Sequence, residues 1–494
     1  MPVPRQEAYE RGKGKTMSRI AAWFVAGAVL SLLFACNGEA RKAAREPAPA
    51  KAQPAQPSVV LPAGAVGTPK EAGADTPKAE TAASKWAPAV KPKPLSENTR
   101  RGLAWLVRAQ HPDGSWGQGE ESAQMGNSME KIAQSANVAD SCLAALALIR
   151  AGSTPGSGEQ AAEIRKALEF VCKEIEQADA QSLFITNLKG TRTQAKLGQF
   201  ADTFMASMLL AEARHQMPDE QSRKRVAAAF HKVMDKIEKN QKADGTWDGQ
   251  GWAPVLQQSL AAKGINRAAQ SGLPVDERVR ERAEKFAGDH FETVNADRPS
   301  SAPSVRLKAP EAAAASGGSA AFADGGGGAG GTAGVELYGF AGNLSAMQDQ
   351  ENTNAARETH LRDELAQTTA SEKKKEIQTT LDRYEANRKQ LKEVKTALVQ
   401  RLDDTQFIQG FGSNGGEEFL SYMNIGEALV VNGGPEWEKW DKQITENLNR
   451  IQNEDGSWTG HHCITGRTFC SAAAILVLTT DRAPVPVAGK IHRR

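Results

Sequence analysis

The sequence predicts an all-α protein built from a repeated helical unit, and two observations support this. First, a helix-length stretch ends three times in a glutamine that is followed by Asp-Gly and a tryptophan, at 110–116, 241–247 and 452–458. Self-similarity of this kind is typical of a helical repeat array. Second, the segments 140–149 and 468–476 consist of small and apolar residues on nearly every side. Helices of that composition are expected in the interior of a protein.

The first 36 residues predict an export signal. An apolar run at 20–35 leads into Leu-Phe-Ala-Cys at 33–36, which has the leucine, small residue and cysteine of a bacterial lipobox. Translation from Met17 would give the signal an ordinary length. Lipidation at Cys36 would make the protein a membrane-anchored lipoprotein of the cell envelope, in the outer membrane of a Gram-negative organism. An uncleaved transmembrane anchor is the alternative, although the run is shorter than the ~20 residues that span a bilayer. Both alternatives place the body outside the cytoplasm.

Residues 37–94 predict a disordered tether. This stretch is rich in proline and alanine, so it cannot bury a core and should behave as an extended linker. Over the whole chain, 61 basic and 59 acidic residues give a formal net charge of +2. This near balance gives no indication of a nucleic-acid partner.

The first glutamine–tryptophan motif carries a family resemblance. Residues 101–116 start with a basic residue and glycine, continue with Trp105 and Leu106, and end in Gln110 and Gly-Ser-Trp. The pattern resembles the QW motif of the terpenoid cyclase and protein prenyltransferase superfamily, which includes bacterial prenyltransferase/squalene cyclase repeat proteins. The resemblance implies an α/α toroid, in which outer helices alternate with inner helices around a central cavity. It also implies that the motif residues link adjacent repeats and are not catalytic; these are Gln110, Trp116, Gln241, Trp247, Gln452 and Trp458.

The body divides at changes in composition. Its expected parts are toroid repeats at 95–300, an Ala/Gly-rich insert at 301–334, a toroid helix at 335–350, one long charged helix at 351–404, the last repeat at 405–482 and a basic tail at 483–494. Within the first part, 202–210 should be a further inner helix, and 163–175 and 275–291 should be outer helices.

The charged stretch 351–404 has apolar residues at heptad spacing from Ile377 to Leu402, but Arg388 and Lys395 fall on the same seam. Two interpretations follow from this pattern. The stretch is either a protruding helix that packs on the toroid, or a coiled-coil-like arm that binds a partner.

Residues with chemical potential gather at predicted inner-helix starts. Asp140 and Cys142 form an Asp-x-Cys that resembles the zinc ligands of protein prenyltransferases, which add a histidine from another repeat. The resemblance therefore implies a zinc site drawn from Asp140, Cys142, His461, His462, Cys463 and Cys470. The family's histidine position falls near Thr468 here.

Two plainer interpretations of these residues stay open. Asp140 and Asp202 could serve as N-terminal helix caps. In an oxidising compartment, Cys463 and Cys470 could form a disulfide.

A glycine-rich turn precedes Glu417 and Glu418, and acidic residues are favourable at a helix N-terminus. If this helix starts at the same end of the toroid as Asp140, then Asp202, Glu417 and Glu418 would lie at the mouth of the cavity.

The fold does not determine the function, because toroids of this kind include enzymes and binding proteins. Prenyl diphosphates are made and used mainly on the cytoplasmic side, which disfavours prenyl transfer by an exported protein. We therefore expect a non-catalytic binding or scaffolding module of the cell envelope that needs no cofactor and recognises an envelope lipid or protein. The alternative is a metal-dependent prenyltransferase-like or terpene cyclase-like enzyme that acts on a lipid or envelope polymer.

Overall fold

The computed structural model describes residues 90–121, 130–296, 329–412 and 414–487, and the described chain is helical. This confirms the predicted all-α class. No helix within these ranges is long and apolar enough to cross a membrane. The signal segment with Cys36 and nearly all of the tether lie outside the described residues.

Six helices are lined almost entirely by buried residues over their core portions. They are α3 (Val138–Arg150), α6 (Ala201–Ala213), α8 (Pro254–Gln270), the first half of α10 (Glu336–Gln367), α13 (Gly416–Val430) and α15 (Arg467–Leu478). Three of them contain the segments predicted to be inner helices at 140–149, 202–210 and 468–476.

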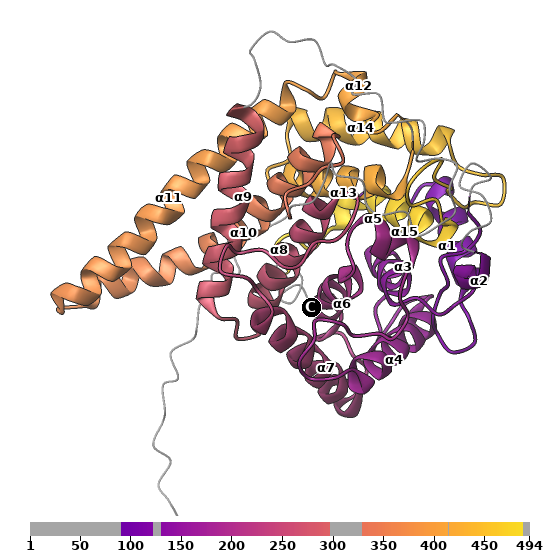
Figure 1. The fold of residues 1–494 in the computed structure, drawn as a ribbon, viewed down its shortest axis with the longest axis horizontal. Coiled ribbons are helices and arrows are strands. Elements are labelled where there is room, and N and C mark those ends of the chain that lie inside the picture. The colour runs from indigo at the N-terminus through magenta and orange to yellow at the C-terminus, as the bar shows by residue number, and fades with distance from the viewer. Residues whose placement is uncertain (1–89, 122–129, 297–328, 413, 488–494) are drawn as a thin grey trace, which may run out of the picture. The chain divides into compact units, whose positions relative to one another are not determined.

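These six helices pack against one another in a closed cycle, which we call the inner ring (Figure 1). In chain order, α3 packs on α6, α6 on α8, α8 on α10, α10 on α13, and α13 on α15, and α15 returns to α3. A closed cycle of inner helices is the arrangement expected of an α/α toroid, so it supports that prediction.

A second set of helices packs on the outside of the inner ring. These helices are α1 (Glu97–Ala109), α4 (Ala161–Gln177), α7 (Glu220–Lys239), α9 (Glu277–Ala296), α11 (Ser371–Val399) and α14 (Pro435–Arg450). Their apolar residues recur at helical spacing, so each buries one stripe, such as Val226, Phe230 and Val233 on α7. Short helices complete the described chain: α2 (Glu130–Ala133), α5 (Arg192–Lys196), α12 (Thr405–Ile408) and the 3-10 turn η4 (Thr480–Arg482).

The three motif glutamines make the same pair of hydrogen bonds. Each side-chain amide donates to the glycine carbonyl of its own turn and to a carbonyl in the first turn of the next outer helix. The acceptors are Gly114 and Glu163 for Gln110, Gly245 and Val279 for Gln241, and Gly456 and Asn98 for Gln452. The third copy joins α14 to α1, so it links the last outer helix to the first.

The motif tryptophans are buried beneath these turns. The indole N–H of each donates to a carbonyl near the end of the preceding helix, at Leu106, Ile237 and Leu448, over 2.8–2.9 Å. The backbone N–H of each donates to a side chain of the following inner helix, at Ser141, Gln258 and Ser471. The motifs therefore tie outer helices to inner helices.

A buried network of charges crosses the inner ring where several of its helices end. Its members are Arg150 of α3, Glu212 of α6, Lys263 and Arg267 of α8, Asp349 of α10 and Glu427 of α13, and each side chain is at most 3% exposed. Glu427 lies 2.6–2.9 Å from Arg150, Lys263 and Arg267. Burial opposes the charge of Glu427, but these three cations hold its pKa well below its usual range. We call these six residues the charge network.

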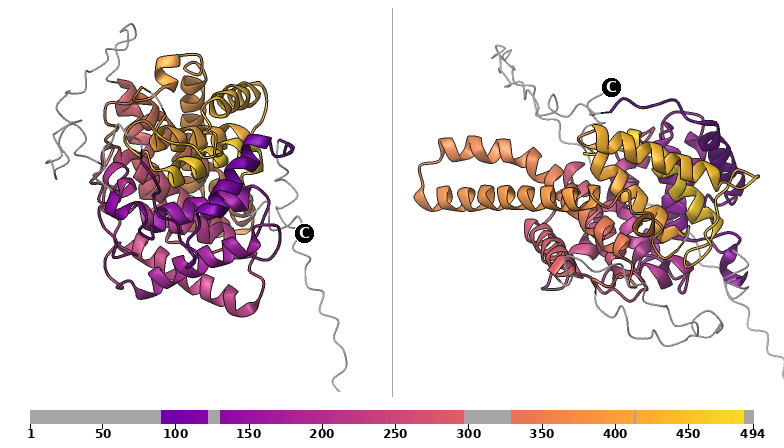
Figure 2. Two further views of the ribbon diagram at one scale, coloured as in Figure 1. Left: turned by 90° about the vertical axis from the view of Figure 1, so that its right-hand side faces the viewer. Right: turned by 90° about the horizontal axis from the view of Figure 1, so that it is seen from above.

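The prediction of one long helix over 351–404 is wrong. Helix α10 continues from the inner ring to Gln367, the chain turns at 368–370, and α11 runs back to Val399. The two halves form a helical hairpin that extends from the ring (Figure 2). Its heptad seam is used internally, because Leu391 and Val394 of α11 are buried and Arg388 pairs with Glu351 and Glu358 of α10.

We predict that Gly245→Ala destabilises the fold by about 1–3 kcal/mol. Gly245 has φ +87°, and an added Cβ would lie 2.1 Å from the backbone oxygen of Arg282 in α9. Urea unfolding measures the cost. Gly272→Ala is the control, since Gly272 has φ +83° but no atom within 4 Å of an added Cβ. Equal costs for the two variants would contradict a role for close packing of the turn.

We predict that Arg267→Met costs about 3–5 kcal/mol, because it leaves buried carboxylates of the charge network without compensation. The free energy of unfolding in urea measures this. The control is Arg223→Met, whose partner Glu220 lies 2.8 Å away in an exposed pair that should contribute only about 0–1 kcal/mol. A cost for Arg267→Met as small as that of the control would show that the charge network is dispensable.

Candidate functional site

Four acidic residues lie in the first turns of inner-ring helices. They are Asp140 of α3, Asp202 of α6, and Glu417 and Glu418 of α13, and their exposed fractions are 0, 2, 0 and 0%. The thiol of Cys470 in α15 feels the charges of Asp140, Glu417 and Glu418, so these helix starts meet at one end of the ring. We call the four residues the acidic layer.

The acidic layer and the charge network lie at opposite ends of the inner helices. Three helices carry one member of each, separated by ten residues: Asp140 and Arg150, Asp202 and Glu212, Glu417 and Glu427. A helix rises about 1.5 Å per residue, so the two layers are ~15 Å apart. Unlike the carboxylates of the charge network, the four acids of the acidic layer form no ion pair with an arginine or lysine of the inner helices among the described residues.

Glu418 has the most defined surroundings of the four. Its Oε1 accepts a 2.6 Å hydrogen bond from the hydroxyl of Tyr338 on α10 and a 3.0 Å bond from the backbone N–H of Phe411. Its Oε2 has no hydrogen bond among the described residues, and Nε2 of His462 lies 3.7 Å away. Burial raises the pKa of Glu418 to about 7, against the effect of the Tyr338 hydrogen bond.

Glu417 lies under the loop that enters α15. Its Oε2 accepts a 3.1 Å hydrogen bond from the backbone N–H of Ile464, while its Oε1 makes no hydrogen bond of good geometry among the described residues. Beyond the effect of burial, the Glu417 carboxyl group is close enough to the thiol of Cys463 to raise the pKa of that thiol. Burial, together with the neighbouring charge of Glu418, raises the pKa of Glu417 to about 7. The backbone of the neighbouring Cys463 has φ +57°, which is unusual for a residue other than glycine, and strained conformations of this kind cluster at functional sites.

Asp140 and Asp202 are not N-terminal caps. Asn137 caps α3 by accepting from the backbone N–H of Asp140, so the interpretation of Asp140 as a cap is wrong. Asp202 accepts from the backbone N–H of Ala139 and from the side chain of Gln194, which joins α6 to α3. Neither oxygen of Asp140 makes a hydrogen bond of good geometry in the described part of the chain, although the side chain of Asn137 and the backbone N–H of Phe469 are near enough to lower its pKa. Burial, and then the charge of Asp202, raises the pKa of Asp140 to about 8.

A row of half-buried side chains lies next to the glutamates. The Nζ of Lys196 is 4.8 Å from the ring centre of Trp252, that ring is 6.0 Å from Phe411, and Phe411 is 5.1 Å from the ring of His462. Lys196 is the last residue of α5, and the other three residues come from three different connections between helices. We call them the mouth strip, because they are partly exposed while Glu417 and Glu418 beside them are not.

The cysteines in the described chain are buried thiols. Cys142, Cys172, Cys463 and Cys470 are all free, so the structure does not contain the Cys463–Cys470 disulfide that the sequence left open. Burial raises the pKa of Cys142, Cys463 and Cys470 well above the ordinary value. A buried, protonated thiol is a poor nucleophile.

The residues proposed as zinc ligands are only partly brought together. His461 is exposed, and its backbone N–H donates to Asn414. The described residues contain no group of three or more His, Cys, Asp or Glu side chains that could hold a metal ion. The observed contacts therefore do not supply the zinc site that the resemblance implied, and zinc stays a prediction without support from this geometry.

Sequence reasoning missed Tyr338, Lys196, Trp252 and Phe411. For Trp252 and Phe411 a signal was present, since each adjoins glycine, in Gly251-Trp252 and Gly410-Phe411-Gly412. Glycines beside an aromatic residue allow a loop to approach closely. An added Cβ at Gly410 would lie 2.5 Å from Oε1 of Glu418, so this loop needs glycine to reach the acid.

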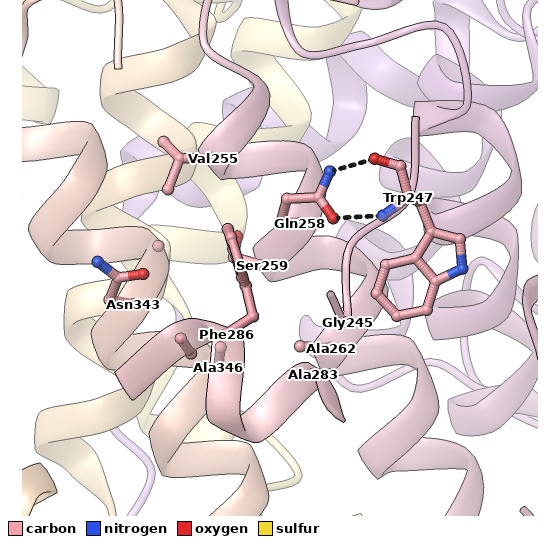
Figure 3. A pocket seen from close by; sticks show the side chains of 12 residues that line it. Gly245, Trp247, Val255, Gln258, Ser259, Ala262, Ala283, Phe286, Asn343 and Ala346 are labelled. Atoms are coloured by element: carbon pink, nitrogen blue, oxygen red, sulfur yellow. Dashed lines mark hydrogen bonds between the residues drawn. The ribbon is translucent and has the colours of Figure 1, made fainter. Parts of the chain in front are cut away.

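A small crevice lies between α8, α9 and α10, and it is lined by Trp247, Ser259, Phe286 and Asn343 among others (Figure 3). Its volume of about 10 Å³ is close to what one water molecule requires. Figure 3 shows the amide of Gln258 bonded to both the N–H and the carbonyl of Trp247, so the polar groups here serve the motif turn. The crevice contains none of the acidic layer, and it is not the candidate site.

Comparison with known proteins finds no match to a family model or to a curated protein. The membership suggested by the motifs therefore stays a prediction, and function has to be argued from the site.

We predict that stability falls as pH rises from about 5 to 8, and that Glu417→Gln/Glu418→Gln reduces this fall. Both glutamates have a pKa of about 7 in the folded protein, above the ordinary value of 4.5. Between these values the folded chain retains protons that the unfolded chain has lost, so raising the pH favours unfolding. Melting temperatures across this pH range measure the effect.

The matched control for that prediction is Glu436→Gln/Glu438→Gln. These two glutamates also lie in the first turn of a helix, α14, but they are exposed. A pH dependence that the buried pair does not change, or that the exposed pair changes equally, would contradict the assignment.

Proposed function

We propose that this protein is a binding module whose ligand site is the acidic end of the inner ring. The observation that carries the proposal is the set of buried carboxyl oxygens that make no hydrogen bond of good geometry among the described residues: both of Asp140, Oε1 of Glu417 and Oε2 of Glu418. Buried polar atoms in native proteins nearly always have a partner, and an unpaired one calls for a bound water, an ion or a ligand group.

The mouth strip supports access to this end. Oε2 of Glu418 faces His462, whose side chain is 16% exposed, whereas Glu418 itself is fully buried. Trp252 and Phe411 are also half-buried, and the indole nitrogen of Trp252 lacks a hydrogen-bond partner within the described chain. The buried Glu418 therefore lies directly behind side chains that are themselves partly exposed to solvent.

The hairpin of α10 and α11 is a weaker candidate for the binding surface. A partner-binding coiled coil needs an apolar seam that is free. The buried residues Ile377, Leu381 and Leu391 of α11 occupy that seam, and Arg388 is paired within the hairpin. We therefore propose that the hairpin is mainly a structural extension.

The N-terminal sequence supports a place for this module in the cell envelope. An apolar run and a lipobox-like cysteine at Cys36 precede a long Pro/Ala-rich stretch. We propose that Cys36 carries the lipid anchor and that the stretch holds the helical body away from the membrane. An envelope lipid or protein partner follows from that location.

One contact favours a second candidate, an acid–base enzyme acting on a lipid or envelope polymer. The hydroxyl of Tyr338 is 2.6 Å from Glu418, and a carboxyl group with a pKa of about 7 is suited to proton transfer near neutral pH. Turnover of such a substrate that is lost in Glu418→Gln but retained in Cys142→Ala would favour this candidate over a thiol-dependent or metal-dependent enzyme.

The binding proposal predicts that a ligand stabilises the wild type but not the Glu417→Gln/Glu418→Gln variant. Thermal unfolding is measured with three probes of different chemistry, namely cadaverine, inorganic phosphate and N-acetylglucosamine. A saturating ligand at about 100 times its Kd adds about 2.7 kcal/mol of stability, which a melting curve detects easily. The Glu436→Gln/Glu438→Gln variant should respond like the wild type.

A stabilisation by any probe that depends on Glu417 and Glu418 supports the proposal. Shifts that are equal in all three proteins, or the absence of a shift with every probe, would overturn it.

A further inference from the structure

The mouth strip already holds one cation of the protein itself. The ammonium group of Lys196 lies 4.8 Å from the centre of the Trp252 ring. This is within the distance at which a ring face attracts a cation. Among the described residues this ammonium group makes no hydrogen bond or ion pair, so the Trp252 ring is its main partner.

The same ammonium group is close to the buried acids. The thiol of Cys463 feels the charge of Lys196 as well as those of Glu417 and Glu418, so all three charged groups lie in the surroundings of this thiol. Lys196 belongs to α5, a short helix whose other end is fixed by a capping box at Thr191 and Gln194. The backbone of Lys196 is therefore held, while its side chain is long and flexible enough to leave.

Glu417 and Glu418 are incompletely paired in this arrangement. In each carboxyl group one oxygen accepts hydrogen bonds from the protein, and the other oxygen makes no hydrogen bond of good geometry. An ammonium group carries three N–H donors, which is the complement of several unpaired carboxyl oxygens. Aromatic rings beside carboxylates form a favourable environment for an organic cation.

We propose that the mouth strip and Glu417/Glu418 recognise a primary ammonium group, and that the side chain of Lys196 is a built-in competitor for that site. This rests on the proposed function, since it names the ligand class of the same site. A ligand ammonium would take the place of the Lys196 ammonium at Trp252 and donate hydrogen bonds to the unpaired oxygens. Free diamines and lysine side chains of another polypeptide carry the same group.

The test is calorimetric titration of the full chain with cadaverine and, separately, with Nα-acetyl-lysine amide. Lys196→Met keeps the length of the side chain and removes its charge, so it should raise the affinity for cadaverine about 5-fold to 10-fold. Trp252→Leu should lower the affinity about 10-fold, and Glu417→Gln/Glu418→Gln should abolish binding. A preference for one of the two probes identifies the source of the ammonium group.

Lys189→Met is the matched control. Lys189 also lies over an aromatic ring, 2.9 Å from the centre of Phe184, but that ring is not part of the mouth strip. Its loss should leave cadaverine binding nearly unchanged, because the charge of Lys189 acts on Asp202 and not on the two glutamates that would bind the ammonium group. If the glutamine pair does not fold, the opposite effects expected of Lys196→Met and Trp252→Leu still test the proposal.

Two outcomes would overturn the ammonium site: no binding of either amine by the wild type and Lys196→Met, or binding that Lys196→Met weakens. If phosphate or N-acetylglucosamine binds in a way that depends on Glu417 and Glu418 while the amines do not, the binding function stands and its ligand class is wrong.

Discussion

The compensation of buried charges in the charge network is the constraint on which the inner ring depends. Arg267 bridges Glu212 and Glu427 across the ring, and Arg150 and Lys263 also contact Glu427. Removing any one of these charges leaves the buried network with one uncompensated charge, which is far more costly than losing an exposed ion pair. The network therefore holds α3, α6, α8, α10 and α13 in one register. Because the acidic layer lies ten residues before the network on three of these helices, the same register brings the acids together at the other end.

The charge network and the acidic layer differ in whether their buried acids are compensated by cations. In the charge network, three cations face three anions, and the pKa of Glu427 is held low by its partners. In the acidic layer no such cation is provided by the inner helices, and burial raises the pKa of Asp140, Glu417 and Glu418 to between about 7 and 8. Helix N-termini favour acids, but this effect is small beside the cost of burying an unpaired charge. Groups kept in that state at one end of a fold are candidates for a functional site.

The motif turns and the hairpin illustrate how local patterns acquire a tertiary role. Each Gln-x-x-Asp-Gly-x-Trp turn makes the same bonds, so three copies suffice to join α1 to α4, α7 to α9 and α14 to α1. The heptad pattern of α11 is equally regular, but it packs within its own chain against α10 and α9. A heptad seam predicts that an apolar stripe is covered, and it does not say whether the cover is the same chain or another.

The sequence by itself determined the all-α class, the motif turns and the buried character of α3, α6 and α15, because these depend on local periodicity and on residue types at short spacing. It did not reveal α8 as an inner helix, since Gln257, Lys263 and Arg267 give that helix a polar composition. Only the tertiary structure shows that these side chains are buried and paired with residues about 55 to 160 positions away. It likewise decided that Tyr338 and Phe411 contact Glu418, and that Trp252 and Lys196 continue the row from Phe411. Pairings between distant segments depend on the path of the whole chain, and no local pattern contains them.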